Sequence, residues 1–146
     1  MKGPFVSISF AVLILALLGF WAYVRLVPSN PAQWNTDPTT ALEWPNDTWN
    51  EVVTLTSGAA LRLRAADDLL ARIDALAMAT PRTTRLAGSV GDGRITWVTR
   101  SALWGFPDYT TAQSSPDGVC IYARLRFGQF DLGVNAVRLR DWQSKL

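Results

Sequence analysis

Three arginines in predicted strands are the residues whose type and spacing could do chemistry. Arg124 and Arg126 are two residues apart, so their side chains share one face of a strand, and Arg100 could join them from a neighbouring strand. A guanidinium group binds a carboxylate or a phosphate through two parallel hydrogen bonds. Asp108 and Asp131, in predicted turns, could pair with these arginines in a structural network. Alternatively, the arginines could bind lipid headgroups or an acidic partner surface.

The residue types that most enzymes use are scarce in this chain. The sequence contains no histidine, which is the commonest general base and metal ligand, and a single cysteine, Cys120. Its two lysines, Lys2 and Lys145, lie near the termini, and its glycines follow neither P-loop nor dinucleotide-binding spacing. We therefore expect no catalytic residue, no cofactor and no metal site. We expect Cys120 to be a buried apolar residue of a strand.

Four aromatic residues flank a break between two predicted strands: Trp97, Trp104, Phe106 and Tyr109. One interpretation places them in the core beneath the sheet. A second makes them the lining of a concave sheet that holds an apolar ligand, such as a lipid tail or a quinone. A third makes them a docking face for another membrane protein. The residue types alone do not separate these three interpretations.

An apolar run from Phe5 to Val27 opens the chain and is long enough to cross the hydrocarbon core of a bilayer. A signal peptide would have a shorter apolar core and a cleavage site between small residues. Here the run ends in bulky aromatics, and Trp21 and Tyr23 suit the membrane interface. We therefore predict an uncleaved transmembrane anchor over residues 1–27.

The orientation of this anchor rests on two basic residues. Lys2 precedes the apolar run and Arg25 lies at its far end, so the positive-inside rule gives a weak preference. That preference places the N-terminus in the cytoplasm and the domain in the periplasm, with the anchor in a bacterial inner membrane. Beyond the anchor, 12 of the 14 basic residues balance the 12 acidic ones. The chain shows no basic patch, so we expect no nucleic-acid partner.

Residues 28–50 form a predicted connector rich in proline and tryptophan. Prolines fix φ and disfavour regular structure, and the connector contains Pro28, Pro31, Pro38 and Pro45. Large aromatics are rarely left in a free linker, and the connector also contains Trp34, Trp44 and Trp49. We expect these tryptophans to pack on the chain's own domain, on the lipid headgroup region or on a partner.

Residues 51–146 form a predicted α+β domain with a curved antiparallel sheet and two helices on one of its faces. The expected strands are 51–56, 61–64, 83–90, 94–101, 109–114 and 119–127, and the expected helices are 66–79 and a C-terminal one that Asp131 caps. In the last helix, Leu132, Ala136, Leu139 and Trp142 are expected to face inward, and Arg138 is expected to face water.

Two motifs in this domain resemble a known family. The run Phe127-Gly128-x-x-Asp131-Leu132-Gly133-Val134-Asn135 resembles the signature of DUF1499, a bacterial and plastid family of unknown function. The aromatic-Gly-Phe-Pro-Asp turn that begins at Trp104 resembles it as well, and the anchor and connector look like an alphaproteobacterial, membrane-anchored branch. The resemblance implies a fold and no established reaction or catalytic residues.

These observations predict a non-enzymatic, single-pass accessory subunit that docks on and stabilises a larger respiratory or photosynthetic complex of integral membrane proteins. The alternative is a membrane-anchored binding module for a lipid or other apolar ligand. In either case the bilayer is a partner. The residues expected to contact the partner or ligand are Trp21, Tyr23, Trp34, Trp44, Trp49, Trp104, Phe106, Arg124 and Arg126.

Overall fold

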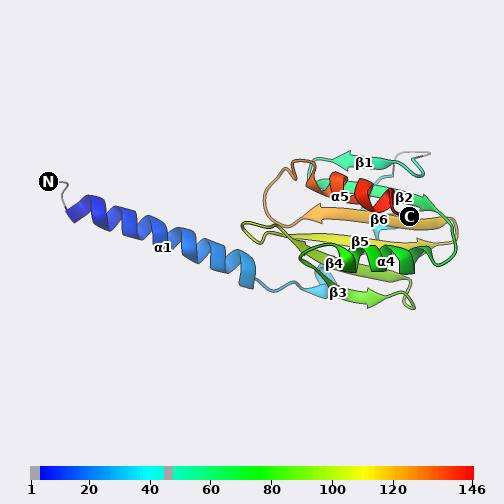
Figure 1. Cartoon of the computed structure of the whole chain (residues 1–146), viewed down its shortest axis with the longest axis horizontal. Helices are drawn as coiled ribbons and strands as arrows, with labels where there is room; N and C mark the ends of the chain where they lie inside the picture. The colour runs from blue at the N-terminus through cyan, green and yellow to red at the C-terminus, as the bar shows by residue number, and fades with distance from the viewer. Residues whose placement is uncertain (1–3, 45–47) are drawn as a thin grey trace.

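The chain is a long helix joined end-on to a single α+β domain (Figure 1). This computed structural model describes residues 4–44 and 48–146, and the side chains from Ile8 onward. Lys2, on which the predicted orientation depends, and Pro45 of the connector lie outside the described residues. The fold class predicted from the sequence, α+β with an N-terminal apolar helix, is confirmed.

Helix α1 spans Pro4–Leu26 and is apolar along nearly its whole length. Its segment Ile8–Leu26 is long and apolar enough to cross a membrane, and only 6% of it is buried within the chain. The buried part is at the end that meets the domain, where Val24 has no exposed surface. A helix this apolar and this exposed needs a covering, which a bilayer would provide.

The connector contains two one-turn helices, α2 (Pro31–Trp34) and α3 (Pro38–Ala41). Each begins with an Asx-Pro pair, in which the side chain of Asn30 or Asp37 accepts a hydrogen bond from the backbone two residues later. Proline at the first helical position has the required φ and loses no hydrogen bond there. The expectation that the prolines exclude regular structure is therefore wrong at these two places.

Six antiparallel strands form one open sheet in the order β1-β2-β6-β5-β4-β3. The last four strands form a meander, and β6 pairs back with β2, so that the first hairpin and the meander share one sheet. The strands are β1 (Val52–Leu55), β2 (Gly58–Arg64), β3 (Thr83–Ser89), β4 (Arg94–Arg100), β5 (Pro107–Ser115) and β6 (Gly118–Leu125).

Helices α4 (Leu69–Ala79) and α5 (Val134–Gln143) cover the same face of the sheet, as predicted (Figure 1). Their apolar residues and alternate residues of the strands form one core. Trp97 and Trp142 meet edge-to-face in it, with ring centroids 6.0 Å apart. Their indole N–H groups donate to the side chains of Asp74 and Thr80, so neither buried donor is left unpaired.

Both helices begin later than the sequence pattern predicts. Helix α4 begins at Leu69 because Asp68 has a left-handed backbone, with φ of 52°. Helix α5 begins at Val134, and Leu132, expected to face inward, is 92% exposed in the loop before it. Asp131 does cap this end, because its carboxylate accepts from the backbone N–H groups of residues 133 and 135.

The connector covers the other face of the sheet. Helix α3 packs on β5 and β6, and the residues of β4, β5 and β6 that point away from α4 and α5 contact the connector. Cys120 lies on this face and is 5% exposed, so its predicted burial is confirmed. Burial raises the pKa of its thiol, which favours the protonated form.

Candidate functional site

Three arginines, Arg100 of β4, Arg124 of β6 and Arg126 just after β6, attach the chain from the end of α1 to the end of α2 to the sheet. Arg124 donates to the carbonyl oxygen of Trp34 at 2.6 Å, and Arg126 donates to that of Pro28 at 2.8 Å. Arg100 reaches the C-terminal end of α1, where it donates to Val24 O at 3.4 Å. Each guanidinium therefore donates to a main-chain carbonyl of the α1–α2 region, and the carbonyl of Trp34 also accepts from Thr111.

The predicted pairing of these arginines with Asp108 and Asp131 is wrong. Arg124 and Arg126 do share a face, as the alternation predicts, but both aspartates lie on the opposite, helix-covered side. Asp108 pairs instead with Arg138 of α5, the residue expected to face water. Burial lowers the pKa of Arg124, and the nearby Tyr122 and Tyr109 oppose that change.

The connector tryptophans also pack on their own domain. Trp34 stacks on Tyr109, with ring centroids 3.8 Å apart and the planes inclined by 11°. Trp44 donates through its indole N–H to Pro38 O at 2.9 Å and lies beside the Arg62 guanidinium. Trp49 lies beside the guanidinium groups of two arginines of β2. Much of each ring is therefore engaged within the chain.

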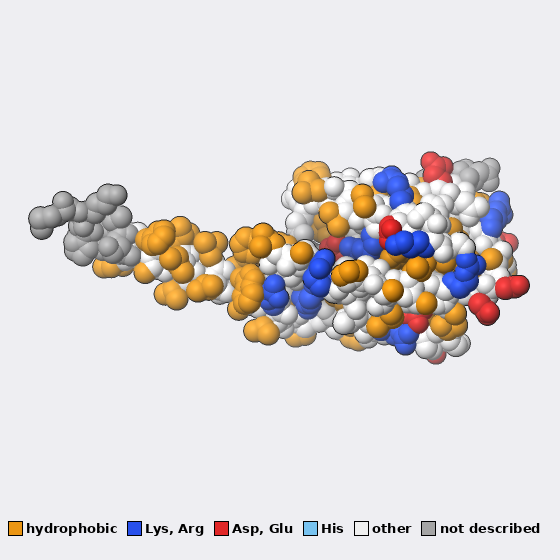
Figure 2. Space-filling view, viewed as in Figure 1, with side chains coloured by type: hydrophobic (Ala, Val, Ile, Leu, Met, Phe, Trp, Pro, Cys, Tyr) orange, Lys and Arg blue, Asp and Glu red, His pale blue; other side chains and the backbone are white. Residues whose placement is uncertain are grey.

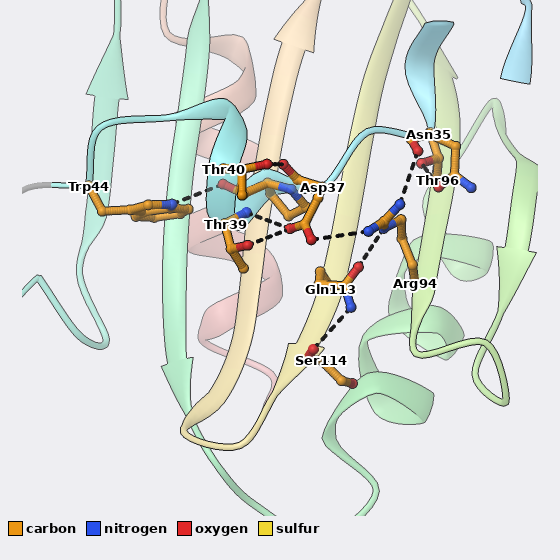
Figure 3. A network of polar contacts seen from close by, with 10 residues as sticks. Asn35, Asp37, Thr39, Thr40, Trp44, Arg94, Thr96, Gln113 and Ser114 are labelled. Atoms are coloured by element: carbon orange, nitrogen blue, oxygen red, sulfur yellow. Dashed lines mark hydrogen bonds and ion pairs between the residues drawn. The ribbon is translucent and has the colours of Figure 1, made fainter. Parts of the chain in front are cut away.

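A polar network centred on Arg94 completes this attachment (Figure 3). Arg94 donates to Gln113, to Asn35 O at 3.4 Å and to the Asp37 carboxylate at 3.1 Å. Burial raises the pKa of Asp37, but hydrogen bonds from Thr39 and the charge of Arg94 outweigh it, so the pKa is lowered overall. The network holds α2 and α3 in place on β4 and β5.

Aromatic residues attach the end of α1 to the domain. Phe20 and Tyr23 of α1 lie 6.2 Å and 6.1 Å from the rings of Phe106 and Phe127, and these two rings are 5.9 Å from each other. Trp21, on another side of the helix, is 41% exposed and lies under the Arg25 guanidinium. Phe106 therefore contacts α1, whereas Trp21 and Tyr23 keep about half of their surface available.

A groove opens on the helix-covered side of the domain, at the end nearest α1. It consists of two adjoining hollows of about 410 and 400 Å³ that share Ser101, Ala102, Asp108 and Val134. The part nearer α1 is lined mainly by apolar side chains, namely Leu103, Trp104, Phe106, Leu125, Phe127, Phe130 and Leu132. Its volume falls within the range of small-molecule sites, and it is open, because Leu103, Phe130 and Leu132 are largely exposed.

The other part of the groove has several polar and charged side chains among apolar ones. Its lining includes Thr80, Arg82, Thr99, Arg100, Asp108, Arg138 and Asp141. Asp108 Oδ2 accepts from Arg138 at 3.2 Å and from the side-chain amide of Asn135 at 3.3 Å. Arg138 also donates to Asn135 Oδ1 and Thr110 Oγ1. The side chains of Arg138 and Asp108 are 10% and 18% exposed, so the pair is largely removed from water.

Burial dominates the electrostatics of this pair. Desolvation raises the pKa of Asp108, despite the opposing charge of Arg138, and repulsion from Asp131 adds to the increase. Desolvation likewise lowers the pKa of Arg138. The groove thus runs from an apolar surface near α1 to the hydrogen-bonded pair of Asp108 and Arg138. The described residues hold no group of three or more potential ligands for a metal ion.

The predicted contact residues therefore fall into separate groups. Trp104 and Phe106 line the groove, Trp21 and Tyr23 lie on α1, and the others attach the connector. Sequence reasoning missed Arg138 as a groove residue and missed Asn135, which is fully buried and hydrogen-bonded to both Arg138 and Asp108. The two family-like motifs were the available signal, because Asp108 belongs to one and Asp131 and Asn135 belong to the other, and the fold brings all three together.

Comparisons with known proteins identify a family and no individual relative. The family model described as "Protein of unknown function (DUF1499)" matches residues 25–146, which include the connector, the sheet and both groove motifs. No curated protein matches the chain, and no solved structure matches it. The matched region covers the entire domain and the connector segment that Arg124 and Arg126 bind. The chain belongs to the DUF1499 family.

Proposed function

We propose that the protein is a membrane-anchored, non-enzymatic binding module whose groove holds an amphipathic lipid. The observation that carries this proposal is the continuity of the two hollows, from aromatic side chains beside α1 to the Asp108–Arg138 cluster. An acyl or other apolar tail would lie against Trp104, Phe127 and Phe130, and a polar head would reach the cluster. Because the apolar part lies beside the anchor, the bilayer is a direct source of such a ligand.

In this proposal α1 anchors the protein in a bacterial inner membrane as a single-pass helix. The N-terminus would lie in the cytoplasm and the domain in the periplasm. The groove would then face the outer leaflet of that membrane.

A substitution that fills the groove tests the proposal. Ala102 is exposed and lines both hollows, so Ala102→Trp should fill the space with little effect on the fold. Val90→Trp, at an exposed turn at the other end of the sheet, is the matched control. Lipids would be extracted from the full-length protein, purified in mild detergent, and quantified by mass spectrometry. We expect a defined lipid in the unmodified and Val90→Trp proteins and about tenfold less in Ala102→Trp.

Two results would count against lipid binding. One is an unmodified protein that carries no lipid beyond the composition of the membrane extract. The other is an Ala102→Trp protein that retains the same lipid in the same amount as the Val90→Trp control.

A second candidate is the accessory subunit of an integral membrane complex, respiratory or photosynthetic. The observation that favours it is the exposed aromatic surface at the end of α1, where Trp21 is 41% and Tyr23 is 56% exposed. Gly19 nearby has no atom within 4 Å of where a Cβ would be, so another helix could approach α1 closely there. This surface, rather than the connector tryptophans, is available to a partner helix.

The accessory-subunit candidate predicts loss of a partner when this surface is changed. Tagged full-length protein would be purified in mild detergent and its companions identified. We expect Trp21→Ala to lose stoichiometric subunits that the unmodified protein and a Val90→Ala control retain. A protein that emerges without companions, or a Trp21→Ala variant that keeps them, would contradict docking through α1.

A further inference from the structure

The loop between β4 and β5, residues 101–106, lies alongside the apolar part of α1. Trp104 from this loop forms a hollow of about 350 Å³ with Ile14, Leu17, Leu18 and Trp21 of the helix. The loop is also attached to the end of the helix, because Arg25 donates to the carbonyl oxygen of Leu103 at 3.3 Å. The loop is held against α1 by this hydrogen bond and by Phe106, whose ring centroid lies 6.2 Å from that of Phe20.

This position sets the depth of the loop when α1 spans a bilayer. Leu18 lies eight residues before Leu26, which is about 12 Å along a helix that rises 1.5 Å per residue. The hydrocarbon core is about 30 Å thick, and crossing it takes about 20 residues. In a bilayer that covers Ile8–Leu26, Arg25, which binds the loop, lies at the interface, and the hollow that Trp104 lines extends inward to Leu17 and Leu18.

The exposed side chains at this end of the domain suit such a location. Leu103 is 75% and Trp104 is 38% exposed on the β4–β5 loop. On the neighbouring loop between β6 and α5, Phe130 and Leu132 are 68% and 92% exposed. Figure 2 shows hydrophobic side chains along α1 and at this end of the domain, with basic side chains where the two meet. Tryptophan at the interface and basic residues beside it are typical of chains that contact lipid.

We propose that the β4–β5 loop is inserted into the bilayer interface beside α1, where Leu103 and Trp104 contact lipid. The domain would then touch the membrane at two places, the helix and this loop, and its orientation over the membrane would be fixed. Insertion of the loop requires that α1 spans the membrane and is independent of lipid binding in the groove. Lipid of the adjoining leaflet would cover the exposed apolar side chains of the loop, because α1 and Trp104 line the same hollow.

Depth-dependent quenching tests this inference on the full-length protein in vesicles. Cys120, buried in β6, is first replaced by alanine so that a single new cysteine can carry an environment-sensitive NBD label. The label is placed by Leu103→Cys in one variant and by Val90→Cys, at the opposite end of the sheet, in the control. A third variant, Ile14→Cys in α1, reports whether the helix is inserted. The vesicles contain phosphatidylcholine and phosphatidylglycerol, with or without doxyl-labelled lipid.

We expect the doxyl lipids to quench the label at position 103 several-fold more than the label at position 90. Aqueous iodide should show the reverse order, and the label at position 14 should be quenched strongly by doxyl lipid. The inference is overturned if position 14 responds to doxyl lipid while position 103 behaves like position 90. It is also overturned if position 103 is shielded from both quenchers, because protein rather than lipid would then cover the loop.

Discussion

The Asp108→Asn variant is expected to lose about 3 kcal/mol of unfolding free energy, because it leaves the charge of Arg138 buried without its carboxylate. Arg138 is 10% exposed, its remaining described hydrogen-bond partners, Asn135 and Thr110, are neutral, and Asp131 acts on it only as a nearby charge. Denaturant unfolding of the full-length protein in mild detergent, followed by tryptophan fluorescence, measures the loss.

Two variants show that the loss comes from the unpaired charge. Asp141→Asn removes an exposed ion pair with Lys145, both partners being about half exposed, and should cost at most about 0.5 kcal/mol. Asp108→Asn combined with Arg138→Met removes both charges and should recover part of the stability. If Asp108→Asn is as mild as Asp141→Asn, water reaches Arg138 and the pair is not a desolvated one.

The Trp34→Ala variant should lose about 3 kcal/mol of unfolding free energy, because an aromatic ring is removed from a packed contact. The ring stacks on fully buried Tyr109, and the Arg124 guanidinium lies 5.3 Å from its centroid. The backbone carbonyl that Arg124 and Thr111 bind would remain. The same unfolding measurement tests this prediction.

Trp34→Phe is the matched control for this variant. The indole Nε1 of Trp34 is buried and has no hydrogen-bond partner among the described residues. Phenylalanine keeps a ring on Tyr109 and removes that unpaired donor, so we expect a cost below about 1 kcal/mol. Equal losses for the two variants would contradict a role for ring stacking. Because Trp34→Ala weakens the fold, loss of a partner in this variant would not locate a docking surface, whereas Trp21→Ala on α1 would.

Local patterns in the sequence were enough to predict the fold class. Period-two alternation assigned the faces of β6, with Cys120 and Arg124 on one side and Ile121 and Ala123 on the other. The turn residues between β3 and β4 predicted that hairpin. The one-turn helices of the connector were also predictable in principle, because Asn30-Pro31 and Asp37-Pro38 both combine a cap residue with proline.

The partners of the strand arginines could not be predicted in the same way. Arg124 and Arg126 bind main-chain carbonyl groups of the connector, and every residue has such a group, so no side-chain pattern marks the acceptor. Arg138 was misplaced because its environment depends on Asp108, which lies thirty residues away on β5. Helical periodicity describes one helix face at a time and contains no information about a charge on a facing strand.

The pairing of β2 with β6 has a consequence for how the chain is made. Strand β2 ends at Arg64 and β6 ends at Leu125, so about 60 residues must be synthesised before the edge of β2 opposite β1 can pair with β6. At roughly 5–20 residues per second this takes on the order of 3–12 s. Helix α5, which packs on β2, is made later still. During that time the β1–β2 hairpin has one edge without hydrogen-bond partners, and α1 has already left the ribosome. Completion of the sheet therefore depends on the synthesis of β6, the last strand described.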